Sequence, residues 1–358
     1  MSSSAGGDCA DWRPTASRET LALRAALLAR ARGFFAARGV LEVDTPIVVN
    51  APVTDVHIHS ARVTLEPPDR AAGRCRPFFL HTSPEYAMKR LLAAGVGDIY
   101  QICHVVRALE RGRLHNAEFT LIEWYRAGHT LDGLMSEVEA LVRELVGEPA
   151  QETSARAGSA GPGAGREGWP LAKPRLRAAT RVSYREAFLR ELGLDPFTAP
   201  LAELGEHARR AGFDRAASCG RDELLELLMG TVIGPRLGHD GLTFVHAYPA
   251  SQAALARLDP QDPRAAQRFE LYCEGIELAN GFHELTAAQE QRSRFEGDIE
   301  ARRRLGLPET TVDERLLAAL EAGLPDCCGV ALGFDRTLML AAGAARIDAV
   351  LPFPIERA

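Results

Sequence analysis

The chain has 358 residues, 46% hydrophobic and 25% charged, a composition typical of globular proteins with length for one or two domains. It has no apolar run long enough for a membrane span, and its polar first residues lack the apolar segment of a secretory signal, so we expect a cytoplasmic protein. The net charge of −6 argues against a broad basic face for gripping nucleic acid.

The seven cysteines lie at positions 9, 75, 103, 219, 273, 327 and 328. Their number is odd, no pair has the CxxC spacing, and no histidine lies near them at zinc-site spacing. This pattern predicts reduced thiols and argues against a disulfide framework or a zinc cage.

Residues 1–17 are predicted to be a disordered lead-in. Apolar residues at three- and four-residue intervals then predict an amphipathic helix over residues 19–38. A strand is expected over residues 40–45, and Pro46 places its end at an edge or an interface. His57 and His59 alternate as strand positions do, and with no third ligand nearby they indicate a polar strand face more than a metal site.

A short strand at residues 77–81 leads into a helix over residues 86–94. Ser83 suits the N-cap of this helix and Pro84 its first turn. Glu85 follows in the first turn, where it either complements the helix dipole or accepts a cationic group of a substrate.

Residues 99–126 contain two β-rich runs, 99–106 and 118–125, around a polar loop, which predicts a hairpin with a long tip. Arg107 lies where the first run ends, and Asn116 and Phe119 lie where the second begins. An arginine and an aromatic ring at the base of one hairpin could hold a phosphate and stack a purine. An amphipathic helix is expected over residues 131–146.

Residues 151–173 are rich in Gly, Ala, Ser and Pro and predict a flexible insertion. The glycines of GPGAGREG lack the Gly-Lys-Ser/Thr ending of a phosphate loop and follow no strand, which argues against one. Helices are expected at residues 183–192, 201–211 and 222–234, and a strand at 242–246.

The stretch YCEGIELANGFHEL, residues 272–285, contains two short strand-like runs around Asn280-Gly281, a dipeptide that favours a type I′ turn. Such a turn places Glu277 opposite Glu284, with their Cβ atoms roughly 5 Å apart. Two carboxylates so placed repel unless a cation lies between them, and they suit magnesium held with substrate phosphates. A solvent-facing hairpin with two screened glutamates is the other interpretation.

Helices are expected at residues 289–305 and 313–322, followed by a strand over residues 329–334. Asp335 and Arg336 then begin a helix that continues to residue 340. An arginine at the N-terminus of a helix combines two features that attract anions.

Together, an Arg/Phe hairpin, a strand with two glutamates and a glycine-rich strand ending in Asp-Arg resemble the catalytic core of class II aminoacyl-tRNA synthetases. The likeness is greatest to the lysyl branch and, within it, to the short paralogues that ligate β-lysine onto elongation factor P. The matching stretches are GVLEVDTP, HTSPEYAMKRLL, RLHNAEFTLIEWYR, FVHAYPASQAALA, GIELANGFHEL and GVALGFDR.

The resemblance implies a role for each matching residue. Arg107 and Arg336 would be catalytic, with Arg107 on the α-phosphate and the substrate carboxylate and Arg336 on the outer phosphates. Phe119 would stack adenine, and Glu277 and Glu284 would hold magnesium. The complete implied ATP site is Arg107, Asn116, Phe119, Glu277, Leu278, Gly333 and Arg336, and the implied amino-acid site is Ser83, Pro84, Glu85, Tyr125 and Glu284.

One position departs from the family pattern. The family hairpin usually reads Arg-x-Glu, whereas Ala108 and Leu109 follow Arg107 here. Glu110 is next, but side chains of neighbouring residues on an extended segment point to opposite faces, so it replaces the missing carboxylate only if the loop shifts. Losing such a bond typically costs about 1.5–3 kcal/mol, or roughly 10- to 150-fold in ATP binding or rate, so we expect weakened activity.

The resemblance implies an α+β protein with an antiparallel sheet flanked by helices, one catalytic domain over residues 18–358, and a homodimer with Pro46 near its interface. It implies ATP and Mg²⁺ as cofactors, lysine or β-lysine as substrate, and elongation factor P as acceptor. Only 22 residues follow Arg336, so we expect no anticodon-binding domain.

Three other functions remain open. A minimal lysyl-tRNA synthetase-like enzyme would act on tRNA. An amidating synthetase would feed ammonia to an aspartyl adenylate, although it needs a cationic side-chain pocket, which Glu85 does not suit. A weakly active or non-catalytic paralogue is favoured only by Leu109.

Overall fold

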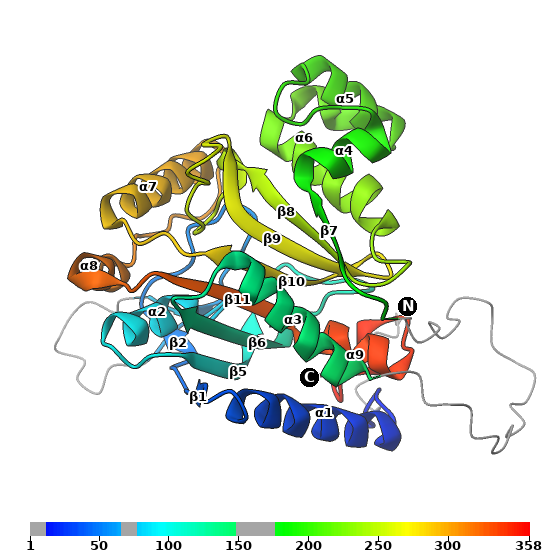
Figure 1. The fold of residues 1–358 in the computed structure, drawn as a ribbon, viewed down its shortest axis with the longest axis vertical. Helices are drawn as coiled ribbons and strands as arrows, with labels where there is room; N and C mark the ends of the chain where they lie inside the picture. Colours follow the sequence, from blue (N-terminus) through cyan, green and yellow to red (C-terminus); the bar gives the residue numbers. More distant parts are fainter. Residues whose placement is uncertain (1–11, 66–76, 148–175) are drawn as a thin grey trace, which may run out of the picture.

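The computed structural model describes residues 12–65, 77–147 and 176–358. Their strands form an eight-stranded sheet in the order β1-β5-β6-β11-β10-β9-β8-β7 and a small sheet in the order β2-β4-β3 (Figure 1). The strands are β1 (Leu41–Glu42), β2 (Val48–Val49), β3 (Arg62–Val63), β4 (Phe78–Leu80), β5 (Ile99–Val106), β6 (Glu118–Ala127), β7 (Thr180–Ser183), β8 (Thr243–Pro249), β9 (Ala265–Cys273), β10 (Ile276–His283) and β11 (Cys327–Gly333). The helices are α1 (Arg18–Ala36), α2 (Glu85–Ala93), α3 (Leu131–Val146), α4 (Tyr184–Leu192), α5 (Leu201–Arg210), α6 (Arg221–Leu228), α7 (Ala288–Arg304), α8 (Glu314–Gly323) and α9 (Phe334–Ala342).

The predicted α+β class is confirmed, but the large sheet is mixed and not purely antiparallel. Strand β1 runs parallel to β5 and β7 runs parallel to β8, whereas the strands between them are antiparallel. Helices lie within both parallel connections, α2 between β1 and β5 and α4 to α6 between β7 and β8. Parallel neighbours require such crossovers. The apolar pattern of a strand does not indicate its direction, so the sequence does not predict that β1 and β7, at the two edges of the sheet, run parallel to their neighbours.

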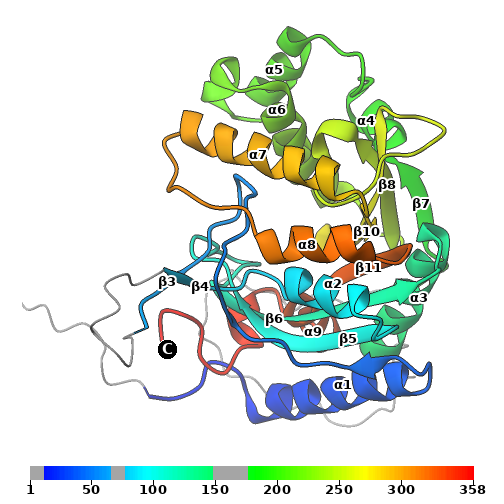
Figure 2. The ribbon, with the colours of Figure 1, turned by 90° about the vertical axis from the view of Figure 1, so that its left-hand side faces the viewer.

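Helices cover both faces of the sheet (Figures 1 and 2). On one face, Phe35 of α1 and Val138 of α3 pack in the same buried cluster as Trp124 of β6, together with side chains of α9. On the other face, Met88 of α2 packs with Tyr125 of β6 and with side chains of α7 and α8. Successive β6 residues therefore point into different cores, which explains the nearly continuous apolar run of this strand.

The predicted hairpin over residues 99–126 is confirmed. Ile99 pairs with Tyr125 and Val106 pairs with Glu118 in an unbroken antiparallel register between β5 and β6. This register brings the end of β5 beside the start of β6, so residues that flank the loop between them lie close together.

The predicted turn at Asn280-Gly281 is wrong, because both residues lie inside strand β10 between β9 and β11. The turn lies upstream at Glu274-Gly275, whose φ values of 51° and 70° are the positive angles of a type I′ turn. Gly281 serves a close approach: a Cβ atom there would lie 2.5 Å from Cζ of Phe269. Without a hairpin at this point, the expected cross-strand pairing of Glu277 with Glu284 is also wrong.

Replacing Gly281 by alanine should therefore lower the free energy of unfolding by about 1–3 kcal/mol, because the new methyl group overpacks the sheet against Phe269. Gly33 is the matched control, since it lies in α1 and a Cβ atom added there would meet no atom beyond its own helix within 4 Å. Alanine there should raise stability by roughly 0.5–1 kcal/mol. Urea unfolding at unchanged slope measures both, and a Gly281→Ala protein as stable as the parent would contradict the close-approach role.

Helices α4, α5 and α6 pack on one another and stand away from the rest of the fold, at the top of Figure 1. Phe188 of α4, Leu204 of α5 and Leu225 of α6 share one buried cluster, which reaches the sheet at Val245 of β8. The predicted helices here are confirmed, with one change. The helix expected over residues 222–234 ends as an α-helix at Leu228 and continues as one π-helical turn, Met229–Ile233.

Several local expectations are corrected near the N-terminus. The strand expected over residues 40–45 is only β1, and the segment with His57 and His59 is a loop in which His57 pairs with Glu226 at 3.2 Å. The end of the predicted lead-in is ordered, since the Thr15 hydroxyl donates to the Leu351 carbonyl at 2.7 Å. Residues 1–11 of the lead-in and the predicted insertion at residues 151–173 lie outside the described residues.

The described residues contain five free cysteines, Cys103, Cys219, Cys273, Cys327 and Cys328. The other two cysteines lie outside this part of the chain. In the same described ranges, no helix combines the length and the apolar character that crossing a bilayer requires.

Candidate active site

A cavity of about 850 Å³ lies over β6, β10 and β11, with walls from the β5–β6 loop, the start of α2 and the start of α9. Its volume lies in the range of ligand-binding pockets. Pro84 is the one predicted site residue outside its lining, and it caps α2 beside a neighbouring cavity of about 70 Å³. The other eleven line the cavity: Ser83, Glu85, Arg107, Asn116, Phe119, Tyr125, Glu277, Leu278, Glu284, Gly333 and Arg336.

One end of the cavity carries an arginine above an aromatic ring. Arg107 directly follows β5, and its guanidinium carbon lies 5.2 Å from the centre of the Phe119 ring. The pairing of Val105 with Phe119 across the hairpin brings the two side chains together. An arginine fork suits a phosphate or a carboxylate, and a partly exposed ring suits a planar base.

Glu110 supplies the carboxylate that is missing at Leu109. The Glu110 amide donates to the Arg107 carbonyl at 3.1 Å, so residues 107–110 form a turn and not an extended segment. In this turn Glu110 folds back and its carboxylate contacts Nη1 of Arg107 at 3.1 Å. Leu109 points outward and is 70% exposed. The condition under which Glu110 could replace the missing carboxylate, a loop that departs from the extended path, is therefore met.

If the chain activates an amino acid with ATP, as the resemblance implies, replacing Glu110 by alanine should lower that rate by roughly 10- to 150-fold, because Arg107 loses a charge-assisted partner worth about 1.5–3 kcal/mol. Replacing the exposed Leu109 by alanine should change the rate by less than about twofold. Pyrophosphate exchange at saturating amino acid measures both variants. Equal losses in the two would contradict the substitution of Glu110 for the usual glutamate.

Arg336 lies in the first turn of α9 and joins three segments of the site. Its guanidinium donates to the Glu277 carbonyl at 2.9 Å and to the Leu114 carbonyl at 3.2 Å, and it lies 3.6 Å from the Glu277 carboxylate. Its other terminal nitrogen lies 2.6 Å from Nε2 of His115. Because arginine only donates, His115 must accept there as a neutral ring, and burial together with Arg336 lowers the pKa of His115.

The Glu277 side chain is 42% exposed toward the cavity. Burial of its surroundings and the nearby Glu270 raise the pKa of Glu277, whereas Arg336, Arg107 and Arg268 oppose this rise. A carboxylate flanked by several arginines suits a site in which phosphate groups and a hard cation share one place.

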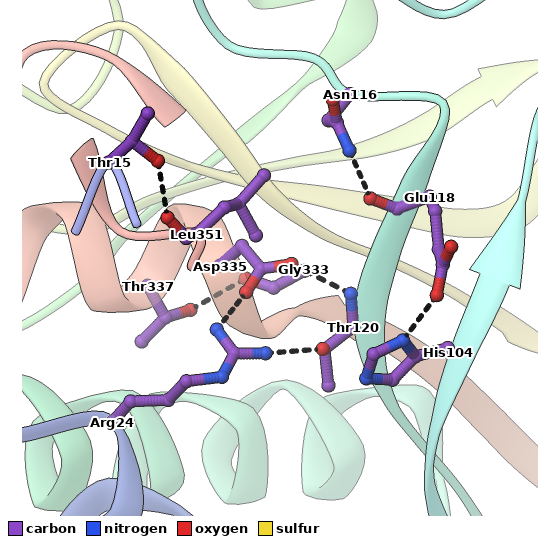
Figure 3. Close-up of polar contacts among 10 residues, drawn as sticks. All are labelled: Thr15, Arg24, His104, Asn116, Glu118, Thr120, Gly333, Asp335, Thr337 and Leu351. Carbon is purple, nitrogen blue, oxygen red and sulfur yellow. Dashed lines mark hydrogen bonds and ion pairs between the residues drawn. The ribbon is translucent and has the colours of Figure 1, made fainter. Parts of the chain in front are cut away.

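A buried polar network holds α9 against β6 beneath this end of the cavity (Figure 3). Asp335 pairs with Arg24 of α1 and accepts from the Thr120 amide at 2.7 Å, and Arg24 also donates to the Thr120 hydroxyl at 2.6 Å. Asp335 is only 1% exposed, so these bonds are shielded from water. Thr120 follows Phe119 and Asp335 precedes Arg336, so the network fixes the spacing of the ring and the second arginine.

Asn116 holds the loop between Arg107 and Phe119. Its amide nitrogen donates to the Glu118 carbonyl at 2.6 Å (Figure 3), and its oxygen accepts from the Ile355 amide at 3.0 Å. The side chain is 5% exposed and both of its ends bond to backbone, so it ties the loop to the C-terminal segment.

The opposite end of the cavity is rich in buried carboxylates. Glu85 comes from α2, Glu123 from β6 and Glu284 from just after β10. Glu123 accepts from the Ser83 hydroxyl at 2.7 Å and from the Tyr125 hydroxyl at 2.8 Å. Burial raises the pKa of Glu123 to about 7 and that of Glu284 to about 8. This end therefore attracts cations and holds protons that are released near neutral pH.

Glu284 does not pair with Glu277. Its carboxylate lies 2.6 Å from the ammonium of Lys89, and it fills space that a side chain at Gly329 would occupy, since a Cβ there would lie 2.4 Å from the Glu284 carboxylate. The hairpin argument for a joint magnesium site therefore fails. The resemblance implied the same pair independently, but the Lys89 ammonium beside Glu284 argues against a second cation there. The described residues also contain no group of three or more His, Cys, Asp or Glu side chains that could hold a metal ion without help from a substrate.

Sequence reasoning missed four residues of the site. Lys89 follows Glu85 by four residues on a helix, a spacing that predicts contact, and Glu123 lies two residues before Tyr125 on the same strand. Those spacings could have identified both. Asn280 and Glu270 gave no signal, because the lining position of Asn280 and the proximity of Glu270 to Glu277 depend on how β9 and β10 pair.

Comparison with known proteins finds one matching family profile and several relatives that share one name. A profile of the family described as tRNA synthetases class II (D, K and N) matches residues 7–357. A protein of Vibrio cholerae named elongation factor P–(R)-beta-lysine ligase is 46% identical over 350 residues, covering 97% of this chain and 99% of the relative. Proteins of the same name from Klebsiella pneumoniae and Salmonella typhi are each 44% identical over 353 residues, with 98% of this chain and 99% of each relative covered.

Proposed function

Since this chain belongs to the family of tRNA synthetases class II (D, K and N), we propose that it activates (R)-β-lysine, or lysine, with ATP and ligates it to a lysine side chain of elongation factor P. The observation that carries the proposal is one cavity with two chemically opposite ends. Arginines and an aromatic ring gather at one end, and buried carboxylates gather at the other. A molecule with a carboxylate and two amines next to a nucleotide fits this division.

ATP is proposed to bind at the arginine end. Phe119 would stack on adenine, Arg107 would contact the α-phosphate and Arg336 the outer phosphates, with Leu278 and Gly333 in the wall. The exposed Glu277 carboxylate between the arginines would hold a magnesium ion that accompanies the phosphates of ATP. Magnesium, when bound, would neutralise phosphate charge. We propose Glu277 as the protein ligand of magnesium and do not include Glu284 in the magnesium site.

The amino acid is proposed to bind with its amines toward the carboxylate end. Glu85 and Glu284 offer charge-assisted hydrogen bonds that select a diamino acid over a neutral one, and Ser83 and Tyr125 line the same wall. Its carboxylate then points back toward Arg107. This orientation places the reacting group between the two ends.

In the first step, a carboxylate oxygen of the substrate attacks the α-phosphorus of ATP. The new oxygen–phosphorus bond forms as the bond to the bridging oxygen of the β-phosphate breaks, and pyrophosphate leaves with that electron pair. Arg107 stabilises the charge that develops on the α-phosphate, and Arg336 holds the departing phosphates. The product is an aminoacyl adenylate.

In the second step, a neutral lysine amine of elongation factor P attacks the activated carbonyl carbon. The carbon–nitrogen bond forms, the carbon–oxygen bond to AMP breaks, and the extra proton of the amine passes to solvent or to the departing phosphate. The product is an amide. The reaction needs no reading of an anticodon, so the proposal includes none.

A homodimer in the cytoplasm is also proposed. The segment around Pro46 exposes two large apolar side chains, Leu41 at 54% and Ile47 at 41%, and such exposure near the predicted interface supports a partner surface. Mass measurement in dilute solution tests this, and a monomer at micromolar concentration would contradict it.

The Arg107–Glu110 pair bears on the competing functions. A non-catalytic paralogue was favoured only by Leu109, and Glu110 now offers the carboxylate that Leu109 lacks. A tRNA-charging enzyme would share the first step and differ only in the acceptor. The two therefore separate in the second step.

The experiment is incubation of the protein with Mg-ATP, (R)-β-lysine and either purified elongation factor P or bulk tRNA. We expect elongation factor P to gain the mass of one β-lysyl group, and the gain should vanish when its acceptor lysine is replaced by arginine. Charging of tRNA with no mass gain on elongation factor P would favour the minimal synthetase instead.

A further inference from the structure

Lys89 is a buried ammonium that the two proposed steps do not use. It lies one helical turn after Glu85 on α2 and is only 1% exposed. Its ammonium contacts the Glu85 carboxylate at 2.7 Å and the Glu284 carboxylate at 2.6 Å, so it joins α2 to the end of β10. Lys89 does not line the cavity, whereas both of its partners do. It therefore lies behind the two carboxylates, on the side away from the substrate.

Burying a lysine is costly, and the fold retains this one only because of its partners. Burial alone would lower the pKa of Lys89, but Glu284 and Glu85 raise it overall, so the ammonium stays charged. Each carboxylate keeps an oxygen that does not contact Lys89. Oε2 of Glu284 has the Lys89 ammonium as its partner, whereas the buried Oε1 beside Gly329 has no hydrogen-bond partner, so a donor from a substrate could satisfy it.

Without a substrate, the charges around Lys89 balance only while its neighbouring carboxyl groups hold protons. The titratable groups that face it or its partners are Glu85 of α2, Glu123 and Tyr125 of β6, Glu284, and Cys327 and Cys328 of β11. Burial keeps the hydroxyl and the two thiols neutral. Once ionised, three carboxylates face one ammonium, and two further ammonium groups would replace the protons that otherwise neutralise this excess.

We propose that Lys89 is a positioning residue for the amino-acid substrate: its ammonium holds Glu85 and Glu284 side by side with one oxygen of each directed at the cavity, and this sets the site for a diamino acid. The inference rests on the proposed function and deepens it. Lys89 acts through its two partners and does not touch the substrate. Its removal would leave two buried carboxylates to repel each other or take up protons.

The inference predicts how substrate binding depends on pH. Below the raised pKa values of Glu123 and Glu284, the cluster holds protons that an incoming ammonium must displace. The KM for the amino acid should therefore fall as the pH rises from 6 to 8. Without Lys89, no ammonium opposes the rise that burial causes in the pKa of the carboxyl groups, so they release their protons at higher pH. The fall in the KM for the amino acid should then move to higher pH.

The test compares Lys89→Met with Arg90→Met in pyrophosphate exchange from pH 6 to 9. Arg90 is the matched control because it lies next to Lys89 on α2, loses the same charge and is exposed. We expect Lys89→Met to raise the KM for the diamino acid about tenfold or more at pH 7 and to shift its pH profile upward. The KM for ATP should stay within about twofold, and Arg90→Met should match the parent in all three measurements.

The outcomes separate this inference from the proposed function. If no amino acid supports pyrophosphate exchange by the parent protein, the proposed function fails. If the parent is active and Lys89→Met keeps the parental KM for the diamino acid and the parental pH profile, only the role of Lys89 is overturned. That role is also overturned if the KM for the diamino acid and the KM for ATP rise equally and the melting temperature falls. Should Lys89→Met not fold, Lys89→Arg carries the test. It keeps the charge and should keep the pH profile while raising the amino-acid KM, and an unchanged KM would overturn the inference.

Discussion

Replacing Arg107 by methionine should lower the rate of pyrophosphate exchange by about a thousandfold or more, because in the proposed first step the guanidinium contacts the charge that develops on the α-phosphate. Arg107 is placed for this role by the end of β5, by the Thr82 carbonyl at 3.4 Å and by Glu110 at 3.1 Å. The loss should appear mainly in kcat, because the contact strengthens in the transition state. Arg107→Lys should recover little, since an ammonium cannot form a bidentate fork.

Arg111→Met is the matched control for this prediction. Arg111 lies in the same loop, is exposed and loses the same charge, but it does not line the cavity. Its exchange rate should lie within about twofold of the parent. An Arg107→Met protein that folds normally and retains a tenth of the parental rate would remove Arg107 from the reaction.

Replacing Glu284 by glutamine should raise the KM for the diamino acid by about a hundredfold or more while leaving the KM for ATP nearly unchanged. Glu284 is 1% exposed and shares the Lys89 ammonium with Glu85. The amide cannot supply a negative charge, so in the proposed binding mode the substrate ammonium loses a charge-assisted bond at a buried position. The preference for lysine-like over neutral amino acids should shrink accordingly.

Kinetics with each substrate varied in turn test this second prediction. Glu300→Gln serves as the control, since Glu300 lies on the outer side of α7 with a 52% exposed side chain and should leave both KM values as they are. A Glu284→Gln protein in which the KM for ATP rises instead would place Glu284 at the phosphates, as the discarded hairpin geometry required.

The parts of the site that depend on neighbouring residues in the chain were predictable from sequence. Arg107 and Phe119 lie at the base of a hairpin whose two strands are long and uniformly β-rich, so their proximity follows from the strand ends alone. The position of Arg336 was also predictable, because a glycine-rich strand followed by Asp-Arg predicts the start of a helix. These local patterns located the phosphate end of the cavity.

The Asn280-Gly281 turn was mispredicted because glycine has two uses. The dipeptide favours a turn locally, yet in the fold the missing side chain lets Phe269 and Val330 approach from neighbouring strands. No feature of the segment itself separates these uses. The pairing of β10 with β9 and β11 decides between them.

The electrostatic partners could be predicted only in part. The four-residue spacing of Glu85 and Lys89 predicts their contact, but the third member, Glu284, is almost two hundred residues away and reaches them only through the sheet. The position of Glu110 depends on the backbone after Arg107, which turns back within four residues and does not continue as an extended segment. Both cases concern where a side chain points, which depends on backbone angles that composition does not reveal.

The most direct test is exchange of labelled pyrophosphate into ATP by the purified protein with (R)-β-lysine, α-lysine and aspartate supplied separately. A cavity that binds a nucleotide at its arginines and amines at its carboxylates predicts exchange with one or both lysines and none with aspartate. Exchange that requires aspartate, or no exchange with any of the three while magnesium and ATP are saturating, would contradict it.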